Sequence, residues 1–187
     1  TLPAGEHLTP IGKAHVLRVG TDITFVAYGA STWIAMEAAE VLAEGGAKVD
    51  LFDAMPSVGR KFLLAGKGGL NLTHSEDLEP FLARYGSSRP LVEAAIRAFP
   101  PSALIAWAES LGQPTFIGSS GRVFPRAMKA SPLLRAWLAR LEQAGVTLLT
   151  RHRLLAIAPN RTLTLEGPDG ARLERPADAV VLALGGG

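Results

Sequence analysis

The chain has 187 residues, of which 48% are hydrophobic and 19% are charged, a composition that excludes disorder and is typical of one globular domain. Its 19 basic and 17 acidic residues give a net charge of +2 without a long basic run, so we expect no nucleic-acid partner. It has no cysteine and only four scattered histidines, so we expect neither disulfides nor a metal site. No apolar run reaches the ~18 residues of a membrane span and no signal peptide opens the chain, which predicts a cytoplasmic protein without a membrane partner.

Strand and helix patterns alternate at the start of the chain. Residues 23–27 predict a strand that ends at Tyr28-Gly29, residues 32–44 predict a helix closed by Gly45-Gly46, and residues 49–52 predict a second strand. Strand, helix, strand is the βαβ unit, whose crossover requires a parallel sheet.

The middle of the chain has helical patterns and the end has strand patterns. We predict helices over 90–99, about 101–111 and 131–143, the last with Ser131 as N-cap and Pro132 at the first helical position, and we expect Trp107 and Trp137 in the core. We predict that residues 80–145 form a helical insertion. Strands follow at 146–150 and, as a small hairpin, at 162–166 and 171–174. A last strand, 179–184, should lie parallel to the first, bringing residues 28–32 near the glycines at 185–187.

The carboxyl ends of these parallel strands are where an open sheet binds ligands. Asp53 ends the second strand, 24 residues after Gly29, close to the ~20-residue offset of an acid that accepts ribose hydroxyls. An acidic residue at a strand end is about as often a turn former. The first turn, "YGASTWIA", is not G-x-G-x-x-G, and a side chain at the second glycine position pushes a pyrophosphate away.

The stretch 53–76, "DAMPSVGRKFLLAGKGGLNLTHSE", combines the basic pair Arg60 and Lys61 with several glycines. Glycines let a backbone approach a ligand closely, and basic side chains suit an anionic group, so the stretch predicts a phosphorylated ligand. The alternative is a surface loop with incidental basic residues. It is not a P-loop, because the spacing is too long and Gly68 replaces the hydroxyl residue that holds magnesium.

From about Ala38 to Gly187 the chain resembles the YhiN/BaiN-type family of predicted NAD(P)/FAD-dependent flavoproteins, through the stretch above, "SSGRVFPRAMKASPLLRAWLARL" and "ADAVVLALGGG". The resemblance implies an α/β fold, with residues 1–187 forming one incomplete glutathione-reductase-like, Rossmann-like FAD/NAD(P)-binding domain. It implies that FAD is the cofactor and NAD(P)H a co-substrate, and that Asp53 meets the adenosine ribose. The expected cofactor-binding residues are Gly29, Asp53, Arg60, Lys61, Gly68, Gly69, Asn71, Thr73, Gly185 and Gly186.

The resemblance also places the segment 119–131, with Arg122, near the flavin or substrate. The alternative is a turn that leads into a capped helix.

Residues 10–53 resemble a different family, the carboxyl-terminal domain of the beta subunit of thiamine-diphosphate-dependent 2-oxo acid dehydrogenases, so residues 1–37 are interpreted as a transketolase-C-like segment. Where the flavoprotein family would carry GGGPAG, this chain has "ASTWIA" at 30–35. A chimera, a misassembled reading frame and a divergent flavoprotein all remain open, and we expect a fragment.

Two functions follow. The first is a flavin-dependent oxidoreductase, or its nucleotide-binding fragment, acting on an unidentified small molecule. The second is a non-catalytic assembly domain related to the dehydrogenase beta subunit. The longer resemblance favours the first, although no catalytic acid, base or nucleophile stands out. Without the glycine-rich turn we expect FAD to be bound weakly or lost, and uncovered apolar sheet surface should favour self-association.

Overall fold

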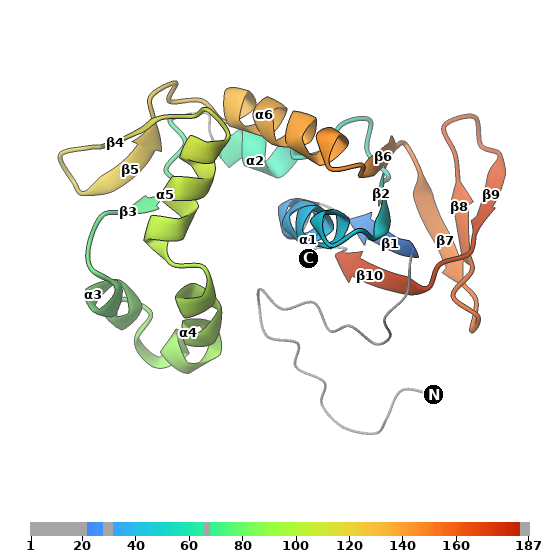
Figure 1. Cartoon of the computed structure of the whole chain (residues 1–187), viewed down its shortest axis with the longest axis horizontal. Helices are drawn as coiled ribbons and strands as arrows, with labels where there is room; N and C mark the ends of the chain where they lie inside the picture. The colour runs from blue at the N-terminus through green and yellow to red at the C-terminus, as the bar shows by residue number, and fades with distance from the viewer. Residues whose placement is uncertain (1–21, 28–31, 66–67, 184–187) are drawn as a thin grey trace.

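The fold is built on a four-stranded parallel sheet. The computed structural model describes residues 22–27, 32–65 and 68–183. The strand order is β10 (Ala179–Ala183), β1 (Asp22–Ala27), β2 (Lys48–Asp53) and β6 (Thr147–Thr150), all parallel (Figure 1). The predicted parallel pairing of the first and last strands is therefore confirmed. The predicted approach of the turn after β1 to the final glycines concerns residues 28–31 and 184–187, which lie outside the described residues.

Helices α1 (Thr32–Glu44) and α6 (Ala130–Gln143) cover one face of this sheet. The core between them contains Met36, Val49, Leu51 and Trp137. Burying each such side chain stabilises the fold by about 1.5–3 kcal/mol. The βαβ unit and the helix predicted near 131–143 are thus confirmed.

The predicted N-cap of α6 is wrong. Ser131 is the second residue of the helix, and Lys129 occupies the cap position in an extended conformation without a side-chain cap bond. The cap lies two residues earlier than predicted because buried Ala130 already packs with Leu133 in the adjoining core. Pro132 is the third residue of the helix and not the first, as predicted, but it lies in the first turn, where its missing N–H costs nothing.

Trp137 joins α6 to α1 through a buried polar contact. Its ring is 1% exposed, and its Nε1–H donates to Glu40 Oε2 at 3.0 Å. Arg140, one turn further along α6, forms an ion pair with the same carboxylate. Trp107 meets Trp137 edge to face, with ring centroids 4.9 Å apart. Both tryptophans therefore pack as predicted, although Trp107 is only partly buried.

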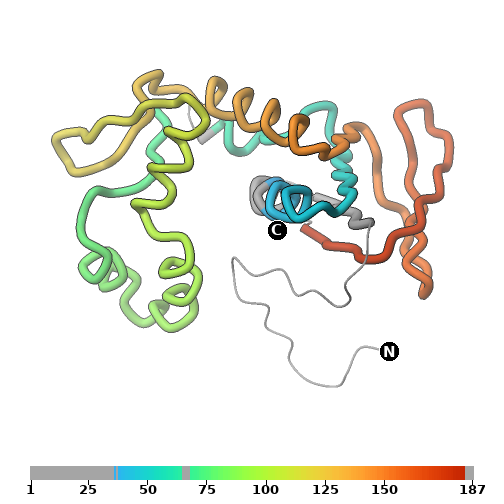
Figure 2. The backbone as a smooth tube through the Cα atoms, viewed as in Figure 1, coloured from blue at the N-terminus to red at the C-terminus, as the bar shows by residue number. Residues whose placement is uncertain are grey.

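A three-stranded antiparallel sheet covers the other face. It consists of β7 (Arg153–Ile157), β8 (Leu163–Glu166) and β9 (Arg172–Arg175), which are drawn orange to red at the right of Figure 2. Leu163 and Leu165 pack against Phe52, whose side chain points away from α1 because successive strand residues alternate between faces. The predicted hairpin β8–β9 is confirmed. Strand β7 was not predicted, because its side chains are mostly exposed and lack clean alternation.

A second body contains a small antiparallel sheet of order β3 (Thr73–His74), β5 (Arg122–Pro125), β4 (Thr115–Ile117). Helix α2 (Arg60–Ala65) and helix α5 (Pro101–Ser110), which was predicted, lie with it beside α6. Leu70, Ala108, Ala130 and Leu133 form its core. The segment around Arg122 is thus a hairpin strand rather than a simple turn.

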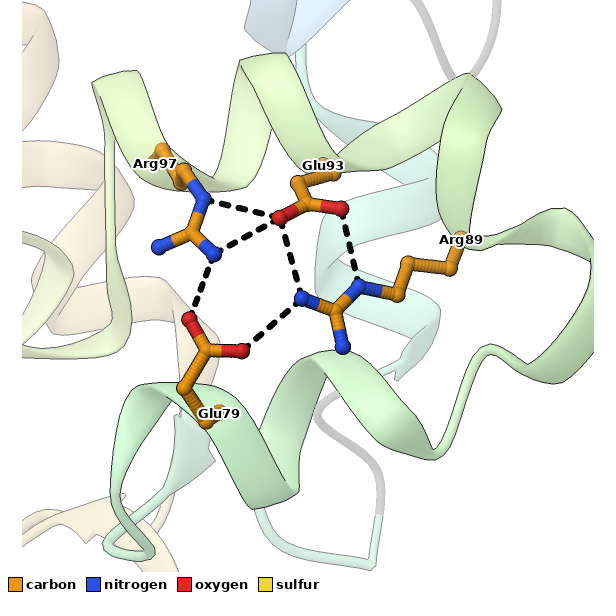
Figure 3. Close-up of polar contacts among 4 residues, drawn as sticks. All are labelled: Glu79, Arg89, Glu93 and Arg97. Atoms are coloured by element: carbon orange, nitrogen blue, oxygen red, sulfur yellow. Dashed lines mark hydrogen bonds and ion pairs between the residues drawn. The ribbon is translucent and has the colours of Figure 1, made fainter.

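Helices α3 (Leu78–Ala83) and α4 (Arg89–Ala98), joined by the 3-10 turn η2 (Gly86–Ser88), form an arm that extends from this body. Helix α4 confirms the helix predicted at 90–99. Four charged side chains link the two helices (Figure 3). Arg89 lies 2.8 Å from both Glu79 and Glu93, and Arg97 contacts the same two carboxylates. Hydrogen bonds from Arg89 and, to a smaller extent, from Arg97 lower the pKa of Glu93 to about 2.

We predict that Glu40→Ala lowers the thermal stability. The substitution leaves the buried Trp137 N–H without its carboxylate, which costs about 1–3 kcal/mol, and each kcal/mol shifts Tm by roughly 2–4 °C in a chain of this size. The matched control is Glu44→Ala, since Glu44 is 57% exposed and lies 3.7 Å from Arg140. It should change Tm by only about 1 °C. Equal losses in calorimetry would contradict a special role of Glu40.

Arg97→Gln should raise the pKa of Glu93 from about 2 towards 4.5, and Arg89 should keep it below that value. Because folding lowers this pKa, the stabilisation is present above pH 4.5 and is lost as the pH falls towards 2. NMR titration of the side-chain carboxyl carbon measures the change. Arg84→Gln is the control, because Arg84 pairs with Glu76 instead. A Glu93 pKa near 4.5 in the unsubstituted chain would refute the network.

Candidate nucleotide-binding site

The carboxyl ends of the four parallel strands form one row. Ala27 is in register with Ala183 on one side and with Asp53 on the other, and Asp53 is in register with Thr150. This register places Asp53 at the edge where parallel sheets bind ligands, as its sequence position predicted.

Asp53 is 3% exposed and holds the turn that follows β2. Its Oδ1 accepts the Met55 N–H at 2.8 Å, and its carbonyl accepts the His152 N–H at 3.1 Å. Arg151, in a left-handed conformation with φ 59°, donates its N–H to the Met55 carbonyl at 3.0 Å. Asp53 is thus a turn former. A carboxylate has about four acceptor sites, so this turn bond is compatible with accepting ribose hydroxyls as well.

Arg60 and Lys61 begin α2, and both are exposed. The preceding residue fixes the position of that helix: Gly59 has φ 69°, and a Cβ there would meet both terminal carbons of Leu134 at 2.9 Å. Helix α2 therefore packs closely along α6. Within the described part of the chain, neither basic side chain forms an ion pair.

Gly68 and Gly69 are the two described glycines of the loop between α2 and β3, here called the glycine loop, and they differ in how much space surrounds them. Gly69 has φ 119°, and a Cβ there would lie 2.8 Å from Met128 Cε. Gly68 is exposed, and a Cβ there would meet nothing within 4 Å. The packing of the chain itself therefore requires glycine at 69 but not at 68.

Asn71 and Thr73 lie against β5. Leu72 donates its N–H to the Val123 carbonyl at 2.9 Å, and Thr73 pairs with Val123 in the small sheet. With its amide turned so that nitrogen faces the carbonyls, Asn71 donates to Thr73 at 2.9 Å and to Val123 at 3.2 Å. These residues hold the glycine loop on the small sheet.

The expected site residues therefore fall into three groups. Asp53 lies at the edge of the parallel sheet, the residues from Gly68 to Thr73 lie on the small sheet, and Arg60 and Lys61 lie on α2, which runs beside α6 between the two sheets (Figure 1). Gly29, Gly185 and Gly186 lie outside the described residues. The sequence analysis missed Arg151 and Met128, which have positive φ without being glycine. No sequence signal marks such positions.

Two features are absent from the residues that the structure describes. Among them, no three His, Asp or Glu side chains are grouped so as to hold a metal ion. Nor does any helix in the described ranges have the length and apolar character needed to cross a membrane.

Residues 22–187 match the model of the HI0933-like protein Rossmann domain. The chain belongs to this family. The match confirms the resemblance to YhiN/BaiN-type flavoproteins, and it begins before Ala38, so that it includes β1 and α1.

Two curated relatives correspond to the two resemblances found in the sequence. The 3-dehydro-bile acid delta(4,6)-reductase of Clostridium scindens is 27% identical over 158 residues, which cover 84% of this chain and 37% of the reductase. The 2-oxoisovalerate dehydrogenase subunit beta of Bacillus subtilis is 42% identical over 52 residues, 28% of this chain and 16% of the subunit. The chain thus spans little more than a third of the longer match.

Solved structures confirm the Rossmann-like fold. The FrdA subunit of E. coli quinol fumarate reductase, with an E245Q mutation, has a TM-score of 0.62 at 19% identity and covers 89% of this chain and 32% of its own. The 3-ketosteroid-delta4-(5alpha)-dehydrogenase of Rhodococcus jostii RHA1 has a TM-score of 0.60 at 14% identity, and the match covers 94% of this chain and 48% of the dehydrogenase.

We predict that Gly69→Ala lowers Tm and that Gly68→Ala does not. An alanine at 69 would have an unfavourable positive φ, at about 1–2 kcal/mol, and would displace Met128. At roughly 2–4 °C per kcal/mol, Tm should fall by several degrees. Gly68→Ala is the matched neighbour, with the same added methyl group and open space around it. Differential scanning calorimetry compares the two, and a larger loss at 68 would contradict this account of the loop.

Proposed function

We propose that this chain is the nucleotide-binding part of a flavin-dependent oxidoreductase, with FAD as its cofactor, NAD(P)H as co-substrate and a small molecule as substrate. The observation that carries the proposal is the family match over residues 22–187, combined with a buried carboxylate, Asp53, at the carboxyl edge of the parallel sheet. We further propose that the protein acts in the cytoplasm.

The proposed roles follow from the positions of the residues. Asp53 accepts hydrogen bonds from the adenosine ribose, and the amino-terminal end of α1 faces the pyrophosphate with its free N–H groups and helix dipole. Gly68 lets the backbone approach the flavin, since nothing in the chain occupies the space of a side chain there. Arg60 and Lys61 meet phosphate oxygens. The flavin supplies the redox chemistry, and the protein binds and orients it.

The turn after β1 limits the affinity. Ala30, Thr32 and Ala35 occupy positions where the fingerprint has glycine, and β-branched Thr32 is the least suited to close pyrophosphate approach. We therefore expect weak FAD binding in the chain as it stands.

A second candidate function is a non-catalytic assembly domain. The 42% identity to a dehydrogenase beta subunit over 52 residues favours it locally. An assembly domain would associate with partner subunits and bind no flavin. Self-association fits both functions, because Leu182 on β10 is 52% exposed. FAD binding after the glycines are restored, as described next, separates the two functions, whereas self-association does not.

FAD titration followed by flavin fluorescence tests the first function. We expect weak binding by the chain and at least about tenfold tighter binding after Ala30→Gly, Thr32→Gly and Ala35→Gly together, because the pyrophosphate can then reach the backbone. The control is Ala43→Gly, which carries a similar helix-propensity cost of about 1 kcal/mol at the far end of α1 and should not change the affinity.

In the triple-glycine background, Asp53→Asn keeps an acceptor for the Met55 N–H but removes the charge. It should weaken FAD binding severalfold, and Gly68→Ala should do so without lowering Tm. No FAD binding even with the glycines restored would refute the flavin proposal. Tight stoichiometric binding by the original chain would show instead that "ASTWIA" substitutes for the glycine-rich turn.

A further inference from the structure

Two segments of the chain contain basic residues and no acidic ones. Between Asp53 and Glu76 there are three lysines and arginines, and between Glu109 and Glu142 there are five, with no Asp or Glu in either segment. These segments therefore hold eight of the chain's 19 basic residues and none of its 17 acidic ones.

The fold joins these two segments into one body. Backbone N–H groups of Leu70 and Leu72 in the first donate to the carbonyls of Met128 and Val123 in the second, at 3.0 and 2.9 Å. Ser75 makes a third such bond to Gly121 at 2.9 Å. The packing of α2 along α6 extends the contact (Figure 1). Basic residues that are separate in sequence are thus carried by one body of the fold.

Six side chains on this body define what we call the basic surface. All six are exposed, and none has an ion pair with any residue that the structure describes. They are Arg60, Lys61, Arg122, Arg126, Lys129 and Arg135. Some arginines elsewhere have acidic partners, as Arg89 and Arg97 do, whereas others, such as exposed Arg172 on β9, have none among the described residues. Like charges gathered without partners create a positive potential that attracts anions over about 10 Å at 0.1 M salt.

The connection from β5 to α6 carries two residues of the basic surface, Arg126 and Lys129. Met128 lies between Arg126 and Lys129 in a left-handed conformation, φ 57°, that non-glycine residues rarely adopt. Its N–H donates to the Pro125 carbonyl at 2.8 Å, and its carbonyl accepts the Leu70 N–H. The Met128 side chain fills the space beside Gly69. The surrounding contacts therefore hold a strained backbone between two exposed cations, and such strain is characteristic of ligand sites.

We propose that this connection, through Arg126 and Lys129 and with Arg122 and Arg135 beyond them, binds an anionic group of the enzyme's small-molecule substrate. Arginine predominates in this set, and its planar fork matches the oxygens of a phosphate or a carboxylate. The identification of the ligand as a substrate rests on the proposed function, whereas the anion site itself does not. A net charge of +2 for the whole chain favours a small anion over a nucleic acid.

Isothermal titration calorimetry of the chain without FAD tests the site, with inorganic pyrophosphate and citrate as probes at low salt. At least one probe should bind, and the double substitution Arg126→Gln and Lys129→Gln should weaken its binding about tenfold or more. The matched control is Arg172→Gln and Arg175→Gln, which removes the same charge from exposed positions on β9. It should leave the affinity nearly unchanged. Binding of pyrophosphate alone supports a phosphate-bearing substrate, and binding of citrate alone supports a carboxylate-bearing one.

Four results would overturn the proposal. In the first, neither probe binds. In the second, the β9 control weakens binding as much as the double substitution does, which would show a general charge effect. The effect is confined to Arg60→Gln and Lys61→Gln, which would place the anion at the residues proposed for FAD phosphates. Single-stranded RNA binds more tightly than either probe, which would make this a nucleic-acid surface. Because no FAD is present, failure of the flavin proposal would not produce any of these results.

Discussion

The packing of α6 is the constraint on which the rest of the structure depends. Leu134, Trp137 and Leu141 on this helix belong to the core of the parallel sheet, whereas Ala130 and Leu133 belong to the core of the small antiparallel sheet. One helix therefore contributes to two cores, and either core alone would leave part of it uncovered. The Glu40 carboxylate restricts the rotation of α6 about its axis, because it can accept the hydrogen bond from Trp137 in one rotational position only.

Contacts with this helix position the residues of the candidate site. The amino-terminal end of α2 lies where Gly59 meets Leu134, and the glycine loop lies where Gly69 meets Met128, immediately before α6 begins. At both glycines a Cβ would come within 3.0 Å of the facing side chain, which would have to move. The loop and the basic pair are thus positioned relative to the parallel sheet through α6, although residues 54–75 come before this helix in the chain.

The parts of the fold that the sequence predicted are those with local signals. Apolar runs, glycine stops and helical spacing predicted β1, α1, β2 and α6. Asp53 was placed correctly at the end of β2 because it directly follows an apolar run. Strand β3 has two residues and pairs with β5, about 50 residues later, so no periodicity could indicate it. Met128 and Arg151 adopt positive φ because hydrogen bonds hold them there, and their residue types favour ordinary conformations. The sequence therefore indicated candidate residues one by one, but it could not indicate their arrangement.

The charges of the two proposed ligand contacts also fix the direction in which a ligand would lie. Asp53 is a buried carboxylate, so it disfavours a phosphate beside it and favours neutral hydroxyl donors. Arg60 and Lys61, the residues proposed for the FAD phosphates, have the opposite preference, and α2, which carries them, lies beside α6 between the two sheets. A ligand with hydroxyl groups at one end and anionic groups at the other is therefore favoured in one orientation only. Reversing it would bring anions to the carboxylate and leave the cations without partners, so that attraction at one end and repulsion at the other both select the same direction.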